Sequence, residues 1–179
     1  MLYILLADGF EETEAIAPID VIRRANLPIT LMGVTGKTVT GAHGIVFEAE
    51  TEMESISKED IDGVILPGGM PGTTNLQKDE RVISLLEYCR DNNKLICAIC
   101  AAPMILGELN MLKGREATCF PGFEEYLKGA VLSPKRVAVD GNFITSKGAG
   151  TALDFGGAIV NYFISGKGDE ILSQMQCYA

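Results

Sequence analysis

The stretch LICAICAAPMIL, residues 95–106, decides the fold that this chain is expected to adopt. It begins as a wholly apolar run, which is typical of a strand buried on both faces, and it continues as an apolar segment of helical character. Cys100 stands between the two halves and is followed by two small alanines. The stretch therefore predicts a tight strand-to-helix turn with a thiol at its apex.

The same alternation of strands and helices extends to both ends of the chain. Apolar runs predict strands over residues 2–7, 28–34, 62–66, 95–99 and 115–119. Helical spacing predicts helices over residues 12–26, 79–92, 101–109, 151–164 and 169–176. Hairpins are predicted for 38–40 with 45–48 and for 136–140 with 143–147. Pro18 is expected to be tolerated only near the first turn of its helix. This order predicts an α/β protein with a mainly parallel sheet covered on both faces.

Three segments with polar or glycine-rich character follow predicted strands. They are residues 8–14, residues 67–72 and Cys100 itself. In open parallel sheets, ligands bind outside the carboxyl ends of the strands. We therefore expect these three segments to converge on one site.

The composition favours one domain over residues 1–179, because an apolar fraction of 47% is ample for a single core. A net charge of −9, with no basic cluster longer than Arg23-Arg24, argues against a nucleic-acid partner. The longest apolar runs are far shorter than the ~20 residues of a membrane span. The first residues lack the basic region of a signal peptide, so a cytoplasmic protein is expected. We expect reduced thiols at all five cysteines: Cys89, Cys97, Cys100, Cys119 and Cys177.

Cys100 is the candidate nucleophile, because a nucleophile between strand and helix is the arrangement of a nucleophile elbow. A helix N-terminus carries free N–H groups and a partial positive charge that lower a thiol pKa, so a thiolate at neutral pH is expected. The alternatives are an inert buried cysteine, a redox pair with Cys97, and a zinc site. The position of Cys97 inside the strand disfavours the redox pair, and a single histidine disfavours zinc.

Glu11, Glu12 and Glu14 stand where the first predicted strand gives way to a helix. Complementarity with the helix dipole is enough to account for Glu11 and Glu12. A carboxyl buried beside a thiolate would be kept protonated by desolvation and like charge, and Glu14, nearest the apolar face of the helix, is the candidate. Glycine-containing stretches at 36–38 and 148–153 lack complete phosphate-binding patterns, so no nucleotide is expected.

Four separated motifs resemble those of the Parkinson-disease-associated protein deglycase family, a branch of the ThiJ/PfpI superfamily. They are EETEA with PIDVIRRA within residues 11–25, VILPGG at 64–69, AICAAP at 98–103 and TSKGAGT at 145–151. They occur in the family's order and spacing and cover nearly the whole chain. The resemblance implies a flavodoxin-like three-layer α/β/α sandwich that is usually a homodimer.

Carried over by position, the resemblance implies that Cys100 is the nucleophile and Glu14 its protonated partner. The backbone N–H groups of Gly69 and Ala101 would line an oxyanion site. The implied activities are glutathione-independent conversion of methylglyoxal to lactate and removal of glyoxal-type adducts from proteins, with no metal or organic cofactor. Oxidation-linked stress protection and chaperone activity are also ascribed to the group.

The sequence departs from the family where many members carry a histidine near the cysteine. Phe120 occupies that position, so a Cys–His dyad is not expected, and the alternative of a redox sensor oxidised to a sulfinic acid at Cys100 gains weight. Cys119 either enters the pocket or packs in the core. His43, the only histidine, either lies on the surface or acts across a dimer interface. The hypotheses are a dicarbonyl enzyme, an oxidation-responsive stress or chaperone protein, and another hydrolase or transferase.

Overall fold

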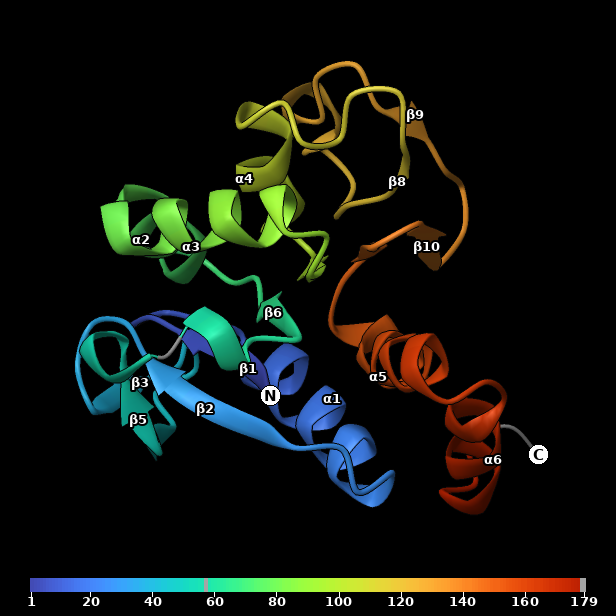
Figure 1. The fold of residues 1–179 in the computed structure, drawn as a ribbon, viewed down its shortest axis with the longest axis horizontal. Helices are drawn as coiled ribbons and strands as arrows, with labels where there is room; N and C mark the ends of the chain where they lie inside the picture. The colour runs from blue at the N-terminus through green and yellow to red at the C-terminus, as the bar shows by residue number, and fades with distance from the viewer. Residues whose placement is uncertain (57, 178–179) are drawn as a thin grey trace.

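The computed structural model describes residues 1–56 and 58–177, and its centre is a seven-stranded sheet in the order β10-β11-β7-β6-β1-β2-β5 (Figure 1). The strands are β1 (Leu2–Leu6), β2 (Ile29–Gly33), β5 (Thr51–Glu52), β6 (Gly63–Leu66), β7 (Leu95–Ile99), β10 (Val137–Asp140) and β11 (Phe143–Ser146). Neighbouring strands run parallel except β10, which pairs antiparallel with β11 at one edge. The prediction of a mainly parallel sheet is confirmed.

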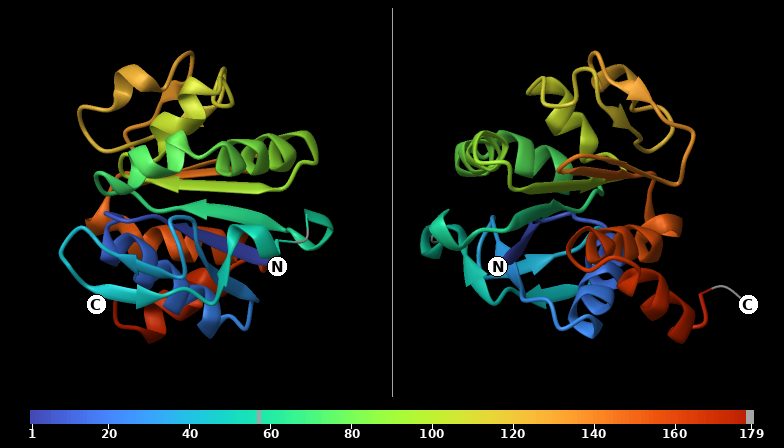
Figure 2. Two further views of the ribbon diagram at one scale, coloured as in Figure 1. Left: turned by 90° about the vertical axis from the view of Figure 1, so that its left-hand side faces the viewer. Right: turned by 45° about the vertical axis from the view of Figure 1, so that its right-hand side comes forward.

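Helices cover both faces of this sheet (Figures 1 and 2). One layer holds α1 (Glu12–Arg24), α5 (Ala152–Phe163) and α6 (Lys167–Gln174), and the other holds α2 (Gly72–Lys78), α3 (Glu80–Asp91) and α4 (Pro103–Glu108). Successive side chains along each strand point alternately toward the two helix layers, as the two-residue period of a strand requires. In β7, Ile96 and Ala98 join the core beneath α3, whereas Cys97 and Ile99 join the core beneath α1 and α5. The predicted three-layer α/β/α arrangement is confirmed.

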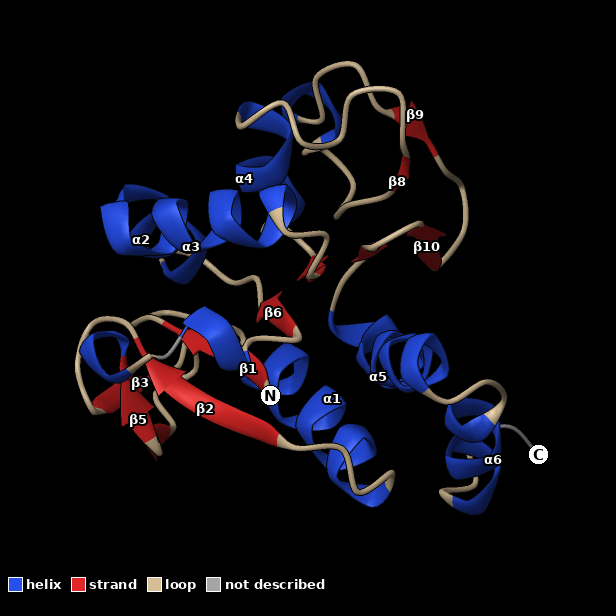
Figure 3. Ribbon diagram, viewed as in Figure 1, coloured by secondary structure: helices blue, strands red, loops and turns tan. Residues whose placement is uncertain are grey.

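Smaller elements surround the sheet (Figure 3). A hairpin pairs β3 (Thr38–Thr40) antiparallel with β4 (Val46–Glu48), as predicted. The strand predicted over 115–119 is reduced to β8 (Glu116–Ala117), which pairs with β9 (Val131–Leu132) outside the central sheet. Single 3-10 turns occur at η1 (Met53–Ser55), η2 (Lys58–Asp60), η3 (Glu124–Tyr126) and η4 (Ala149–Thr151). Within the described residues, none of the helices has the length and apolar character to cross a membrane.

Pro18 lies in the interior of α1, so the expectation that it would be tolerated only near the first turn is wrong. Proline cannot donate a backbone hydrogen bond, and its ring disturbs the preceding turn. Packing against α5 compensates for this cost, because Pro18 is buried there against Gly156. A side-chain carbon on Gly156 would come within 2.9 Å of the Pro18 Cα. The close approach of the two helices therefore depends on that glycine.

Candidate active site

Cys100 follows directly on β7 and adopts a left-handed backbone conformation with φ of 64°. This conformation costs a non-glycine residue roughly 1–2 kcal/mol, so the surroundings must hold it in place. The Cys100 N–H donates to the carbonyl of Ser146 at 2.9 Å, and the Cys100 carbonyl accepts from the N–H of Phe120 at 2.8 Å. Ala101 and Ala102 are buried, so only small side chains fit beside the turn. The predicted strand-to-helix turn is present.

Glu14 of α1 points into the same place and is only 1% exposed. Its Oε2 accepts a hydrogen bond from the backbone N–H of Gly68 at 2.9 Å, and its carboxyl also hydrogen-bonds the Cys100 thiol. Gly68 lies between the two side chains, where the space is too narrow for a side chain of its own. A side-chain carbon there would lie 2.6 Å from both Cys100 Cβ and Glu14 Oε2. The sheet therefore brings the three predicted segments together, with Cys100 and Glu14 in direct contact.

Burial raises the pKa of both groups. Burial, together with the charge of Glu11, raises the pKa of Glu14 to about 7. Burial and the Glu14 carboxylate raise the pKa of Cys100 to about 12. The expected thiolate at neutral pH is therefore wrong for Cys100 taken alone. The reason is that the thiol is desolvated by burial and that its ionisable partner, Glu14, is an acid rather than a cation. Between these two pKa values, the pair together holds a single proton.

Two backbone N–H groups counteract this rise. Those of Gly69 and Ala101 hydrogen-bond the Cys100 sulfur and lower its pKa. Gly69 has a φ of 85°, and a side-chain carbon there would lie 2.7 Å from the Gly9 carbonyl oxygen. Only glycine suits this position. The result is a buried acid, a thiol and two N–H donors gathered at the carboxyl ends of β1, β6 and β7.

Known proteins resemble this chain over most of its length. Residues 1–162 match the DJ-1/PfpI family. The chain belongs to that family. It is 34% identical over 178 residues to the Parkinson disease protein 7 homolog of Danio rerio, covering 97% of this chain and 93% of that protein. It is 37% identical over 161 residues to the Arabidopsis thaliana protein DJ-1 homolog B, covering 88% of this chain but only 36% of that longer protein. The solved structure of oxidized Toxoplasma gondii DJ-1 superposes with a TM-score of 0.93 at 27% identity, covering 99% and 98% of the two chains. The resemblance of the four sequence motifs is thereby confirmed at the level of the DJ-1/PfpI family.

Two further candidate residues of this DJ-1/PfpI chain, Phe120 and Cys119, differ in their surroundings. Phe120 is 47% exposed, and its ring lies against Gly148 beside the Glu14 carboxyl. Cys119 is buried and lines a separate cavity of about 330 Å³ with Thr118. Burial raises the pKa of Cys119 to about 11. Phe120 thus lies beside the Cys100–Glu14 pair. Cys119 packs in the core, as one alternative expected, but it lies beyond the end of β8 rather than in a strand.

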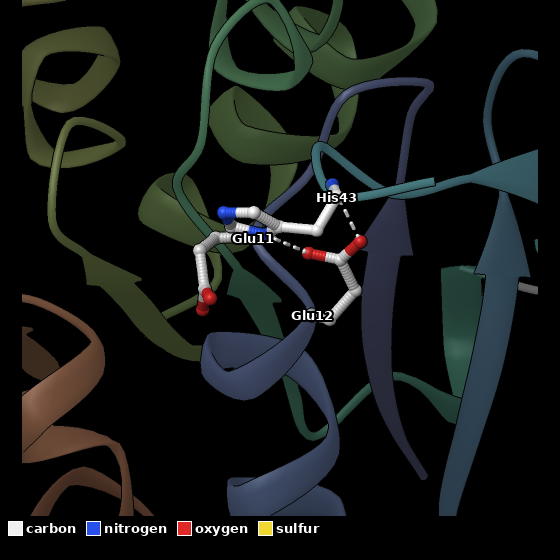
Figure 4. Close-up of side chains that lie close together, drawn as sticks. All are labelled: Glu11, Glu12 and His43. Atoms are coloured by element: carbon white, nitrogen blue, oxygen red, sulfur yellow. Dashed lines mark hydrogen bonds and ion pairs between the residues drawn. The ribbon is translucent and has the colours of Figure 1, made fainter. Parts of the chain in front are cut away.

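His43 contacts Glu12, a pairing that sequence reasoning missed (Figure 4). The backbone N–H of His43 donates to Oε1 of Glu12 at 2.7 Å, and the ring Nδ1 lies 2.7 Å from Oε2. The imidazole itself is 70% exposed, which agrees with the predicted surface position. Burial acts to raise the pKa of Glu12, but the two hydrogen bonds from His43 lower it overall. The same contact raises the pKa of His43. No local signal marks the pair, because the two residues are 31 positions apart.

Glu11 completes a small cluster with Glu12 and His43, whose ligand atoms lie within 4.8 Å of one another. Side-chain oxygens and an imidazole nitrogen at this spacing are metal-ligand types. Each group, however, already has a protein partner. Glu11 Oε2 caps α1 by accepting from the Glu14 N–H at 2.7 Å, and both oxygens of Glu12 bond to His43. These contacts account for the cluster, so we assign it no metal.

Proposed function

We propose that this chain is a cysteine-dependent, glutathione-independent glyoxalase and protein deglycase that acts on methylglyoxal-type dicarbonyls or their adducts. The observation that carries the proposal is the hydrogen-bonded Cys100–Glu14 pair with the N–H groups of Gly69 and Ala101 at the sulfur. A thiol with an adjacent base is the arrangement of an activated nucleophile. Membership of the DJ-1/PfpI family supports the proposal at the level of the family.

The first step uses the single proton that the pair holds. The Cys100 thiol passes its proton to the Glu14 carboxylate as the sulfur attacks the aldehyde carbon, so no free thiolate has to persist in the resting state. The electron pair of the aldehyde C=O moves to its oxygen, where the N–H groups of Gly69 and Ala101 stabilise the charge. Glu14 then returns the proton to this oxygen, and the product is a hemithioacetal.

The second step begins with Glu14 in its base form. Its carboxylate removes the proton from the former aldehyde carbon, giving an enediolate with its charge on the former ketone oxygen, and delivers that proton to the former ketone carbon. The hydroxyl proton on the former aldehyde carbon moves to the charged oxygen as the thioester carbonyl forms. The product is a thioester of Cys100, which water hydrolyses to the hydroxy acid and the free thiol. The sum is one dicarbonyl plus one water to one hydroxy acid, with no oxidant or reductant.

The test is the formation of lactate from methylglyoxal by purified protein without glutathione. Wild-type protein is expected to turn over, and Cys100→Ser is expected to lose turnover by at least a hundredfold, because an alcohol in place of the thiol is a far weaker nucleophile at neutral pH. Turnover that survives in Cys100→Ser would contradict the proposal. Turnover absent from both proteins would also contradict it.

A second candidate function is oxidation sensing in a stress-response or chaperone role. Cys100 is only partly buried, and its neighbouring N–H groups and the Glu14 carboxyl suit a sulfinic acid. One solved relative is described as an oxidized DJ-1. Under dilute peroxide, two equivalents would add two oxygen atoms to the sulfur and leave two waters. Mass spectrometry of the Cys100 peptide tests this, and a stoichiometric gain without dicarbonyl turnover would favour sensing over the enzyme.

We also infer a homodimer that uses the surface of α1 and the β3–β4 hairpin. Ile16, Ile45 and Val46 are 38%, 54% and 61% exposed, and the first two line an apolar hollow of about 660 Å³ with Leu153. A contiguous apolar surface of this kind is typical of an interface. Ile45→Glu is expected to shift the mass measured by light scattering from dimer to monomer. A monomeric wild-type chain would contradict the inference.

A further inference from the structure

Phe120 forms an apolar wall at the rim of the Cys100–Glu14 pair. Its ring atom Cδ2 and the Oε1 atom of Glu14 both lie within 4 Å of one point, the position of a side-chain carbon built on Gly148. The absence of a side chain at Gly148 is what lets the ring lie there. Phe120 is 47% exposed, so roughly half of the residue is in contact with solvent.

The backbone that carries this ring is held by hydrogen bonds at Phe120 and two residues before it. The Phe120 N–H donates to the Cys100 carbonyl at 2.8 Å, so the backbone of the wall is joined directly to the turn that carries the thiol. Two residues earlier, the buried N–H of Thr118 donates to Oγ1 of Thr145 at 2.9 Å. The ring of Phe123 supports the outer edge of Phe120, with the two centroids 6.5 Å apart. The wall is therefore held in place before any ligand arrives.

The groups around the Cys100–Glu14 pair divide into a polar part and an apolar part. The polar part consists of the Glu14 carboxyl and the N–H groups of Gly69 and Ala101, which suit the two oxygen atoms of a dicarbonyl. The apolar part is the open area of Phe120. A dicarbonyl has one further variable group, the substituent on its ketone carbon. An apolar substituent would cover the ring and remove apolar surface from water, whereas hydrogen would leave it exposed.

We propose that Phe120 is a specificity-determining residue and that it selects dicarbonyls with an apolar substituent on the ketone carbon, in the order aryl, then methyl, then hydrogen. This inference rests on the proposed function and names the substrate class of the same site. An aromatic substituent has the additional advantage of ring-to-ring contact. Phe120 takes no part in proton transfer, since its side chain carries no titratable group.

The experiment compares kcat/KM for phenylglyoxal, methylglyoxal and glyoxal in wild-type protein and in Phe120→Ala and Phe120→Leu. The preference for phenylglyoxal over methylglyoxal is expected to fall about two- to tenfold in Phe120→Ala, with a smaller fall in Phe120→Leu. Phe163→Leu, the same change at a 37% exposed phenylalanine at the end of α5, is the matched control and is expected to leave the ratio unchanged. A ratio that is unchanged or that rises in Phe120→Ala would overturn the proposal, because a rise means that the ring blocks large substituents.

A second measurement separates this proposal from the proposed function. If none of the three dicarbonyls is turned over, the proposed function has failed. The wall is then tested by the rates at which N-phenylmaleimide and N-ethylmaleimide alkylate Cys100, identified by peptide mass. Loss of the preference for the phenyl reagent in Phe120→Ala would retain Phe120 as the residue that selects apolar electrophiles. An unaltered preference would overturn that role as well.

Discussion

Glu12 and Glu14 stand two residues apart in the first turn of α1, and their pKa values are shifted in opposite directions. Both are more than 90% buried, at 7% and 1% exposed. Residues two apart on a helix point in directions roughly 200° apart, so Glu12 faces the β3–β4 hairpin and Glu14 faces the thiol turn. Glu12 meets His43, and its pKa is lowered, whereas the pKa of Glu14 rises to about 7. Burial acts to raise both values, so the partner decides the direction.

The largest effect that would test this contrast is expected from Glu14→Gln. Removal of the base is expected to reduce methylglyoxal turnover by about 10²–10⁴-fold. Because glutamine carries no charge, the pKa of Cys100 is expected to fall below that of the wild type, which the pH dependence of thiol alkylation measures. Glu12→Gln is the matched control, and an equal loss of turnover in that variant would show that the two carboxylates do not differ in function.

The contrast also predicts opposite dependences of stability on pH. The pKa of Glu14 rises from 4.5 to about 7 on folding, so the stability due to its protonated form is complete below pH 4.5 and is lost as the pH rises to 7. This loss amounts to about 3 kcal/mol of the free energy of unfolding. Urea denaturation over this range is expected to show a flatter profile for Glu14→Gln. A slope that persists in the variant would assign it to another group.

For Glu12 the sign is reversed. Its pKa is lowered on folding, so its contribution to stability is present above the unfolded value of 4.5 and is lost as the pH falls through the folded value. In Glu12→Gln, the loss of stability on acidification below pH 4.5 is expected to be smaller than in the wild type. Thermal unfolding of both proteins between pH 3 and pH 5 gives the comparison, and parallel profiles would refute it.

Two glycines allow the same change to be made in each region. An alanine at Gly68 would place a methyl group 2.6 Å from Cys100 Cβ and 2.9 Å from the Ile99 carbonyl oxygen, so Gly68→Ala is expected to cost about 1–3 kcal/mol. At Gly41 the three atoms nearest the methyl group all belong to the Glu12 side chain rather than to backbone, so a side-chain rotation that breaks the bonds to His43 can relieve the collision. Gly41→Ala is therefore expected to be less destabilising. Denaturation midpoints rank the pair, and the opposite ranking would show that the hairpin region is the more rigid.

The smallest effect is expected at the single histidine, whose imidazole gives one resonance pair in an NMR titration. The contact with Glu12 raises the pKa of His43 above 6.5, and Glu12→Gln is expected to return it toward that value. The charged pair exists between the lowered pKa of Glu12 and the raised pKa of His43, so it is lost as the pH rises through the latter. An identical titration curve in the variant would show that the pair does not form in solution.

Much of the fold could be predicted because its signals are local. The strand over 95–99 is predicted at its observed bounds, because its apolar run begins after the polar residues 92–94 and ends at the turn at Cys100. Helix α2 (Gly72–Lys78) was missed, because its sequence GTTNLQK contains several weak helix formers and only tertiary packing decides it. Pro18 was misjudged for a similar reason, because its tolerance depends on a glycine in α5 that is distant in sequence.

Predictions about the site likewise succeeded where the signal is local in the sequence and failed where it depends on tertiary packing. The sequence by itself determined that a thiol would stand at a strand-to-helix turn, because apolar periodicity and small neighbours are read along the chain. It also identified the acidic helix start that faces the thiol. Within that helix start, the sequence also singled out Glu14, because it lies nearest the apolar face. Only the tertiary structure decided that His43 pairs with Glu12 and that the thiol pKa is raised rather than lowered. The physical reason is that desolvation and hydrogen-bond partners depend on which distant segments pack around a group, and linear spacing does not specify them.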